Sequence, residues 1–179
     1  GWDVSNVTNP NRMFYNATSF NQPIGDWKTS KFYDMDSMFK NATSFDQDLN
    51  SWNLSSAVKM TKLFFGARSF DKPIGNWDIS NVTRLDEMFV NAVNFNQPIG
   101  NWDVSAVQNM FNMFRNATSF NQDLSDWNVG TVTNMATMFS GANNLSSGYK
   151  GLIHQSFSSN PNWDTDWSAH IPAPAVLTN

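Results

Sequence analysis

Four oxygen-bearing side chains near the C-terminus have the spacing of a calcium-binding loop. Alternate positions are occupied by Asn160, Asn162, Asp164 and Asp166, and Ca²⁺ binds carboxylate and amide oxygens that a single loop supplies in this way. Thr165 stands where a tight calcium loop has glycine, and no glutamate follows to complete the coordination. A polar turn that ends the fold is the preferred interpretation, and a calcium site is the alternative.

Other groups that do chemistry are scarce. The chain has only two histidines, His154 and His170, and neither lies in an acidic cluster or a recurring motif. It has no cysteine, which excludes a thiolate nucleophile, thiolate metal ligands and disulfides. Catalysis needs titratable groups brought together in one site. The sequence therefore predicts a non-enzymatic protein without a cofactor, in which His154 is a structural, partly buried residue.

N-linked glycosylation is a more specific candidate. The acceptor pattern Asn-x-Ser/Thr occurs seven times, at Asn6, Asn16, Asn41, Asn53, Asn81, Asn116 and Asn144. The repeat described below also generates this pattern by placing asparagine at helix ends, so both explanations stay open. We expect Asn16, Asn41 and Asn116 at exposed helix ends on one edge of the fold.

Composition excludes several classes of partner. The formal net charge is -4, and the 11 Lys and Arg residues are scattered, which is not the pattern of a nucleic-acid or anionic-membrane surface. No apolar run is long enough to span a membrane. The sequence begins inside a repeat without an initiator methionine or signal-peptide pattern, which is typical of a processed or partial product.

The chain is built from six repeats of 25 residues. A tryptophan and a phenylalanine recur at this period without a slip, at Trp2, Trp27, Trp52, Trp77, Trp102 and Trp127, and at Phe14, Phe39, Phe64, Phe89, Phe114 and Phe139. A fixed period of this size indicates supersecondary units stacked on one another. Because one repeat has too few apolar residues to fold alone, we expect one core that continues along the stack.

Two periodicities alternate within each repeat. Val82, Leu85 and Met88 have helical spacing, whereas Trp77 and Ile79 alternate as in a strand. A column of only Asn and Gly ends the helical part, and these residues accept the left-handed conformation that ends a helix. Its members are Asn16, Asn41, Gly66, Asn91, Asn116 and Gly141. Each repeat is thus predicted to contain one short strand and one short helical or 3₁₀ arm.

Two polar columns and the tryptophan column are candidate ligand sites. An Asn or Asp follows a phenylalanine in five repeats, from Asn21 to Asn121, and a serine recurs from Ser5 to Ser105. Hydrogen-bonded ladders that satisfy the stacked backbone explain both columns better than a ligand array does. The tryptophan column is interpreted as core. Aromatic residues that face a ligand are expected to be irregular ones, such as Tyr15, Tyr33 and Phe65.

The end of the repeat array predicts a change of structure. Tyr149, Leu152, Ile153 and Phe157 have the spacing of an amphipathic helix. We expect residues 1–147 to form the repeat solenoid, 148–170 to cap it, and 171–179 to form an extended tail. The predicted fold class is a leucine-rich-repeat-like solenoid of six 25-residue turns with a helical C-terminal cap.

The other end of the predicted stack has no cap. Trp2 and Val4 would leave apolar core and strand edge exposed, and stacks need covered ends. We hypothesise head-to-tail self-association into a filament, in which this end receives the apolar tail that contains Ile171, Val176 and Leu177.

The pattern W-D-V-S-x-V-T-x-M-x-x-M-F-x-x-A-x-x-F-N-Q-P-I-G-N resembles the mycoplasma-type 25-residue repeat of BspA-like surface proteins. Val104, Met110, Met113, Phe114 and the pair Asn121-Gln122 match it around Trp102. The resemblance implies a relative of leucine-rich-repeat solenoids and an extracellular or cell-surface protein without enzymatic activity. Its expected role is adhesion or structural assembly with other surface proteins or glycans, and a carbohydrate-binding module is the alternative.

Overall fold

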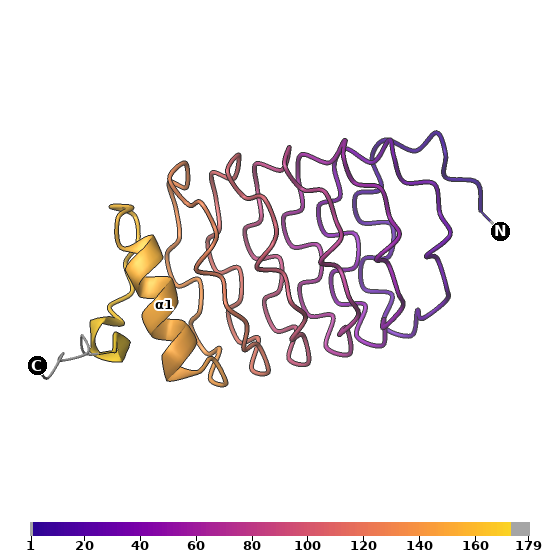
Figure 1. Ribbon diagram of the computed structural model, residues 1–179. Coiled ribbons are helices and arrows are strands. Elements are labelled where there is room, and N and C mark those ends of the chain that lie inside the picture. Colours follow the sequence, from indigo (N-terminus) through magenta and orange to yellow (C-terminus); the bar gives the residue numbers. More distant parts are fainter. Residues whose placement is uncertain (1, 173–179) are drawn as a thin grey trace, which may run out of the picture.

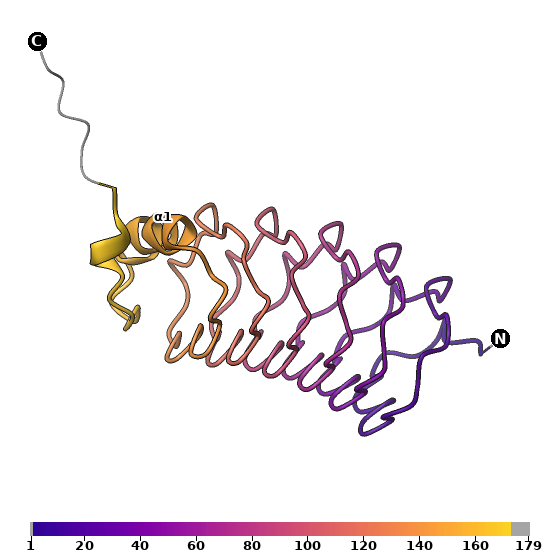
Figure 2. The ribbon, with the colours of Figure 1, turned by 90° about the horizontal axis from the view of Figure 1, so that it is seen from below.

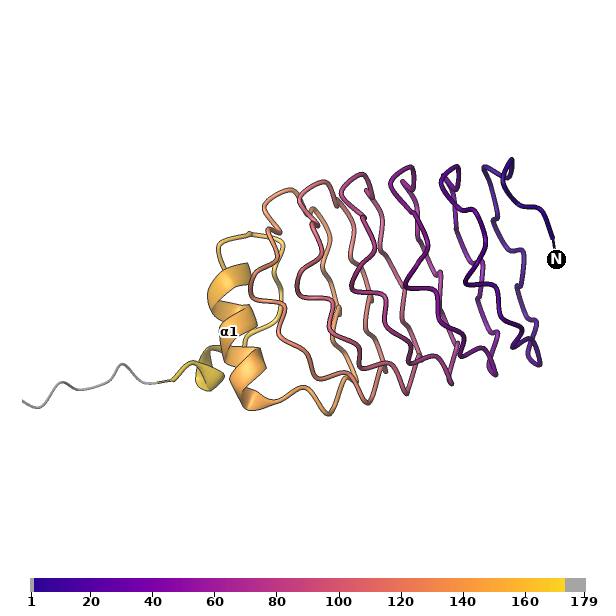
Figure 3. The ribbon, with the colours of Figure 1, turned by 45° about the vertical axis from the view of Figure 1, so that its right-hand side comes forward.

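The computed structural model describes residues 2–172, which wind into a stack of similar turns (Figure 1). After the last turn come the α-helix α1, Ser147–Phe157, and the short 3₁₀ helix η1, Ser168–His170. Figures 1 and 3 show the turns side by side, with α1 lying across the end of the stack. Residues related by one 25-residue period therefore occupy equivalent places in neighbouring turns.

The predicted fold class is wrong. Within residues 2–172 there is no sheet, and the only extended pairings are isolated parallel bridges that link Asp34, Lys59, Arg84, Asn109 and Asn134 in succession. No turn of the described stack contains a helix. A leucine-rich-repeat-like solenoid with a strand and a helical arm in each turn is thus overturned, and turns joined by short bridges replace it.

Left-handed residues explain why the arm is not helical. The Asn/Gly column has positive φ as predicted, with Asn16 at 57°. A second position, four residues earlier, is also left-handed and was not predicted, because its members are mostly residue types that avoid this conformation: Arg12, Ser37, Lys62, Glu87, Asn112 and Thr137. A helix needs φ near -63° throughout. Two left-handed residues so close together leave no room for a regular helical turn.

Backbone hydrogen bonds alternate along the arm. Odd-numbered residues of the first arm donate to the third residue before them, as Met13 N–H does to the Pro10 carbonyl (3.0 Å). Even-numbered residues donate to the next turn, as Phe14 N–H does to the Met38 carbonyl (2.9 Å). The same alternation recurs in the later turns. Only every second N–H group points to the neighbouring turn, so neither a helix nor a continuous ladder forms.

Side chains join the turns along the other half of the repeat. The Asn/Asp column forms a ladder in which each side-chain oxygen accepts the backbone N–H one turn later, from Asp46 N–H on Asn21 (2.9 Å) to Ser146 N–H on Asn121 (3.0 Å). The ladder predicted for this column is confirmed. The serine hydroxyls bond locally instead, as Ser80 does to Asp78 (2.7 Å).

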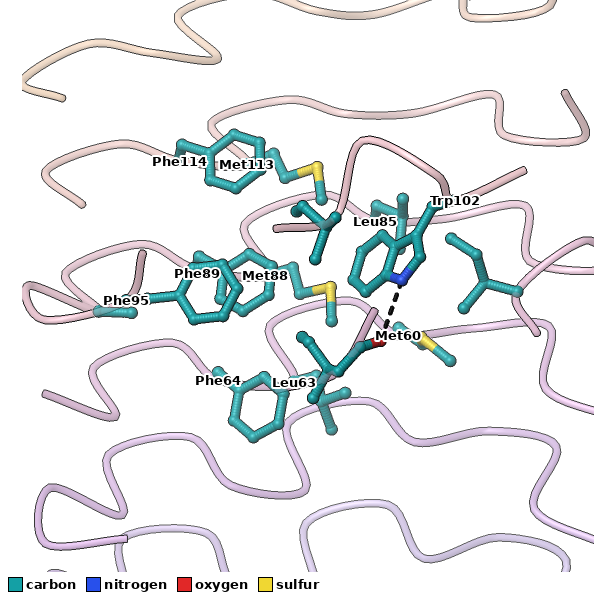
Figure 4. Packing of buried hydrophobic residues seen from close by; sticks show 14 of the residues in the cluster. Met60, Leu63, Phe64, Leu85, Met88, Phe89, Phe95, Trp102, Met113 and Phe114 are labelled. Atoms are coloured by element: carbon teal, nitrogen blue, oxygen red, sulfur yellow. Dashed lines mark hydrogen bonds between the residues drawn. The ribbon is translucent and has the colours of Figure 1, made fainter. Parts of the chain in front are cut away.

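Tryptophan side chains supply further links between turns. The indole N–H groups of four tryptophans donate to a carbonyl 28 residues earlier: Trp52, Trp77, Trp102 and Trp127. Figure 4 shows this bond for Trp102, whose side chain packs in the core beside apolar residues of neighbouring turns. These four residues are 2–4% exposed, so their predicted place in the core is correct.

The two modes of linkage curve the stack. Successive phenylalanine rings in the column from Phe14 to Phe139 lie 5.4–5.8 Å apart. Successive tryptophan rings from Trp27 to Trp127 lie 6.3–6.5 Å apart. The turns thus spread on the tryptophan side, where side chains bridge them, and the stack bends as Figure 2 shows.

Helix α1 closes the last turn. Ser146 caps its N-terminus by accepting the Tyr149 N–H (3.3 Å), and Ile153 and Phe157 are fully buried. Leu152, which the helical pattern placed on the apolar face, is 40% exposed. The helix therefore covers the core with a narrower face than the pattern indicated.

Candidate functional site

Each of the four candidate calcium ligands makes a side-chain hydrogen bond within the fold. Asn160 is buried, and its amide nitrogen donates to the carbonyls of Val129 (2.7 Å) and Val132 (2.9 Å). Its oxygen accepts the Asn162 N–H (2.8 Å), and an Asp166 oxygen accepts the Ser168 N–H (2.9 Å). Within residues 2–172 no group of three or more His, Cys, Asp or Glu side chains could hold a metal ion.

Asn160 instead completes the last turn. In the preceding turn the equivalent carbonyl, that of Val107, accepts a bond from the Thr131 hydroxyl of the following turn (2.9 Å). After the last turn Asn160 supplies a donor to the Val132 carbonyl in the same way, and it adds a second donor to the Val129 carbonyl, which already accepts the Val132 N–H (3.0 Å). Sequence reasoning missed this role, because nothing in the local pattern indicates which distant carbonyls the amide reaches.

His154 is part of the aromatic end of the stack. Its Nδ1 accepts the indole N–H of Trp163 (3.1 Å) and the backbone N–H of Trp167 (3.4 Å). The Trp163 and Trp167 rings pack edge to face, and both lie against Phe139. The geometry gives His154 a structural task as an acceptor, as the sequence predicted. His170 lies in η1, whose C-terminal backbone packs closely on Gly151.

The candidate glycosylation sites lie on the surface of the turns. All seven asparagines are exposed except Asn41, which is half-buried. Asn41 donates its amide to the Asn16 side chain (2.9 Å), and Asn116 donates to Asn91 (3.0 Å). Asn16, Asn41 and Asn116 stand at left-handed turn ends rather than at helix ends. Asn81 is tied by its amide to the Ser55 carbonyl (2.9 Å).

The first turn presents an apolar end. Trp2 is 67% exposed, and its ring stacks on Phe14 (6.1 Å) and Trp27 (6.0 Å). A hollow of 250 Å³ lies among these rings, Phe20 and the neighbouring residues Gln22, Pro23 and Ile24. Val4, the other candidate at this end, is buried.

The tail candidates for self-association lie at the other end of the chain. Ile171 is half-buried just after η1. Val176 and Leu177 lie outside the described residues.

One edge of the stack combines aromatic rings with cations. The Lys40 ammonium lies 4.7 Å from the Phe65 ring centre and 5.6 Å from that of Tyr15, and the Arg12 guanidinium approaches Tyr15 at 5.9 Å. Tyr15, Lys40, Phe65 and Arg115 share one repeat position in different turns. We call these four residues, together with Arg12, the aromatic-cationic strip, and the repeat position that the four share the strip position. Sequence analysis had singled out Tyr15 and Phe65, and the 25-residue period would have added Lys40 between them.

Charges are segregated around the stack. Positions 11 to 18 after each tryptophan hold Lys40, Arg68 and Arg115, with no acidic residue in residues 2–146. Residues 21–31, 46–56, 71–81, 96–106 and 121–131, which run from position 19 after one tryptophan to the fourth residue after the next, hold eight acidic residues and three lysines. Taken over the whole stack, positions 11 to 18 therefore carry net positive charge, and the opposite arc carries net negative charge.

The acidic arc contains a hollow of 540 Å³. It runs across several turns, and we call it the loop groove. Its lining residues are Asn50, Pro73, Gly75, Asn76, Pro98, Gly100, Asn101, Gln122, Asp123 and Tyr149. Sequence reasoning missed the groove because it arises from the spacing between loops of different turns.

The pKa shifts of charged side chains come from hydrogen bonds and charges close to each group. A hydrogen bond and the charge of Asp46 raise the pKa of Lys72, and the Ser105 hydroxyl and N–H lower the pKa of Asp103. A two-bond contact with Asp86 raises the pKa of Arg84. Each perturbed group has its partner within the same or the neighbouring loop. None of these pairs has the opposed acid and base that general acid-base chemistry uses.

Comparison with known proteins matches most of the chain to a family. A family described as "Mycoplasma protein of unknown function, DUF285" matches residues 1–83 and 51–152. A search of curated proteins finds no match, and a search of solved structures finds none either. Within residues 2–172, no helix is long and apolar enough to cross a membrane.

Proposed function

This chain belongs to the Mycoplasma repeat family of BspA-like 25-residue repeats, and from that premise we propose that it is a non-catalytic surface protein. We place it outside the cell or on the cell surface. Its role is adhesion, and the aromatic-cationic strip is the surface that contacts the partner.

The contrast between constant and variable repeat positions carries this proposal. The tryptophan, methionine and phenylalanine positions that recur in every turn are buried in the central turns. The residue at the strip position differs in every turn, through Tyr15, Lys40, Phe65, Val90, Arg115 and Ser140, and all of these except Val90 are exposed or half-buried. A partner with a regular lattice requires the same side chain in each turn. A surface that changes from turn to turn fits one irregular macromolecular partner, and aromatic and Arg residues are typical of such contacts.

Attachment of coated beads to cultured epithelial cells tests the proposal. Beads carrying residues 1–179 should attach more than bare beads, and Tyr15→Ala combined with Lys40→Ala should reduce attachment to background. Tyr33→Ala is the matched control, because Tyr33 is 50% exposed but lies outside the strip. All variants should keep the melting temperature of the parent. Attachment equal to that of bare beads, or unchanged in the double variant, would contradict the proposed function.

Glycosylation belongs to the same proposal. We expect glycans on exposed acceptor sites such as Asn16 and Asn116 when the chain is secreted through a eukaryotic pathway. Intact mass before and after enzymatic deglycosylation measures occupancy. Equal masses from such a host would remove glycosylation from the proposal without affecting adhesion.

Structural assembly is a second candidate function, favoured by the apolar end. The exposed Trp2 ring and the 250 Å³ hollow beside it offer apolar surface to another turn of the same kind. In a longer chain a preceding turn would occupy this face, so the test uses residues 1–179. Light scattering should show association that Trp2→Ser weakens. A mass that stays monomeric across micromolar concentrations would exclude assembly through this end.

A further inference from the structure

The loop groove lies next to the tryptophan column, whose rings are spaced more widely between turns than those of the phenylalanine column from Phe14 to Phe139. Its lining residues occupy positions 20 to 24 after a tryptophan, next to the column whose rings are spaced 6.3–6.5 Å apart. The same positions of the first two turns form a smaller hollow of 250 Å³. The groove therefore follows the stack across successive loops and suits a chain-like ligand better than a compact one.

Glycines keep the groove free of side chains where loops come close. A Cβ atom added to Gly75 would lie 2.8 Å from the Pro98 carbonyl oxygen, and one added to Gly100 would lie 2.6 Å from that of Asp123. Loops of successive turns thus meet through bare backbone at these points. Exposed Pro73 and Pro98 stand beside them and give the groove small apolar surfaces.

The polar side chains of the groove have hydrogen-bonding capacity that the fold does not use. Asn101 donates its amide to the Gly75 carbonyl (3.0 Å), and Gln122 donates to the Asn96 carbonyl (2.8 Å), so the side-chain oxygen of each stays available. One carboxylate oxygen of Asp123 accepts the Ser125 N–H (2.9 Å), and the other oxygen stays available to a ligand. The exposed Asn76 side chain makes no hydrogen bond within residues 2–172.

The lining chemistry selects a neutral, hydroxyl-rich ligand. Among the described lining residues there is no lysine, arginine or histidine, and Asp123 is the single carboxylate, so an anionic ligand would meet no compensating charge. Carboxylate and amide oxygens accept bonds from hydroxyls, and the Asn76 amide donates to them. The half-buried Tyr149 adds an aromatic surface at the α1 end. We propose that the loop groove binds a neutral oligosaccharide, which lies along the stack across several turns.

An extended peptide fits the groove less well. Peptides that add to a fold as a strand need a row of free backbone donors and acceptors. In this arc the Gly75 carbonyl already accepts from Asn101, and side chains bridge the turns where backbone groups would pair. The available groups are side-chain amide and carboxylate atoms, which suit hydroxyls on a sugar ring.

Titration with defined sugars tests the site. Linear hexamers of glucose, mannose and N-acetylglucosamine are added to residues 1–179, and binding is followed by amide NMR shifts and calorimetry. We expect at least one hexamer to bind, with shifts centred on the lining residues. Asn76→Ala should weaken it about twofold to tenfold through the lost hydrogen bonds. Asp126→Ala is the matched control, because it occupies the same repeat position, is exposed and lies outside the groove.

The outcomes separate this site from the aromatic-cationic strip. Binding that Asn76→Ala weakens and Asp126→Ala leaves unchanged supports the groove, whether or not the chain adheres to cells. The proposal is overturned if no hexamer binds at millimolar concentration, or if Asn76→Ala has no effect. Binding of acidic saccharides alone, lost with Lys40→Ala, would also overturn it and would assign the sugar to the strip.

Discussion

Removal of the Trp102 side chain tests the physical account of the stack. Trp102 is 4% exposed, and its ring stacks on Trp77 (6.3 Å) and Trp127 (6.4 Å) in the two adjacent turns. Its indole N–H donates to the buried Ile74 carbonyl (3.1 Å). Trp102→Ala therefore removes core volume, two aromatic contacts and the hydrogen bond that joins two turns.

The expected loss is large. A Trp→Ala change in a packed core costs about 3–5 kcal/mol. Loss of the indole hydrogen bond adds about 0.5–1.5 kcal/mol, because the Ile74 carbonyl keeps the Trp77 N–H as a donor (3.2 Å). Because the terms overlap, we expect about 4–6 kcal/mol, a large fraction of the 5–15 kcal/mol that is typical of a domain. Trp102→Phe keeps much of the ring and should cost about half as much.

Calorimetry and hydrogen exchange measure the effect without relying on tryptophan fluorescence. In a stack, each turn contacts mainly its neighbours. The loss should therefore appear first as faster exchange in the turns on both sides of Trp102. Exchange near α1 should change less, because that end keeps its own packing against the last turn.

Trp2 is the matched control, since it is the same residue at the same repeat position. It is 67% exposed and stacks on Phe14 and Trp27 only from the end. Trp2→Ala should cost about 1 kcal/mol or less. Equal losses for Trp2→Ala and Trp102→Ala would refute the claim that continuous burial and bonds between turns hold the stack together.

Three further substitutions probe other parts of the turn. Gly100→Ala should lower stability by about 1–3 kcal/mol through overpacking, because its Cβ would lie 2.6 Å from a carbonyl oxygen of the next turn; thermal unfolding measures it. Thr137→Asn should raise the free energy of unfolding by about 0.5–1 kcal/mol, because Thr137 is left-handed (φ 56°) and Asn tolerates that conformation; denaturant unfolding checks the sign. Asn160→Ala should cost about 1–3 kcal/mol, because two hydrogen bonds of a buried amide are lost, while the Val129 carbonyl keeps the Val132 N–H (3.0 Å) and the Val132 carbonyl keeps the Asn162 amide (3.2 Å); hydrogen exchange should rise in the last turn.

Each of these changes has a control within the chain. Gly130→Ala brings a Cβ only to 3.2 Å from the Asn128 side chain, and should change stability by less than about 0.5 kcal/mol. Ser140→Asn places the same new side chain at an exposed site without positive φ. Ser159→Ala removes an exposed hydroxyl close to Asn160. If a control substitution changes stability or hydrogen exchange as much as its test substitution does, the physical cause assigned to the test substitution is wrong.

The sequence predicts those features of the fold that follow from the residue type recurring at one repeat position. The 25-residue period identifies the family, and the tryptophan column predicts buried residues such as Trp77 and Trp102. The Asn/Asp ladder was also predictable, since short polar side chains recurring next to buried aromatics must satisfy neighbouring backbone groups. These inferences need only the residue types in a column.

The arm could not be predicted in this way because its residue types and its conformation disagree. Val82, Leu85 and Met88 have helical spacing. Glu87, which lies within this segment, nevertheless has the left-handed backbone conformation, as does Asn91 four residues later. Glutamate favours helices and gives no signal of positive φ. Contacts with the next turn impose the conformation, as the Glu87 N–H bond to the Phe111 carbonyl (2.8 Å) illustrates. Tertiary contacts override local preference here.

The two candidate sites also differ in how far the sequence predicts them. Tyr15 and Phe65 stood out because they break the repeat pattern on the surface. The loop groove gave no such signal, since Asn76 and Asn101 read as ordinary loop residues. Their proximity depends on how far the turns spread, which a single repeat does not determine.

The two ways of joining turns also explain where a binding surface can develop. In the arm, backbone bonds such as Phe14 to Met38 fix the spacing whatever side chains point outward. The outward strip position can therefore change from Tyr15 to Lys40 to Phe65 without disturbing the stack. On the opposite arc the links are side chains, so a substitution such as Asn101→Ala changes both the groove and the bond to the next turn. Variation should thus accumulate on the strip, while the groove keeps a restricted set of small polar residues.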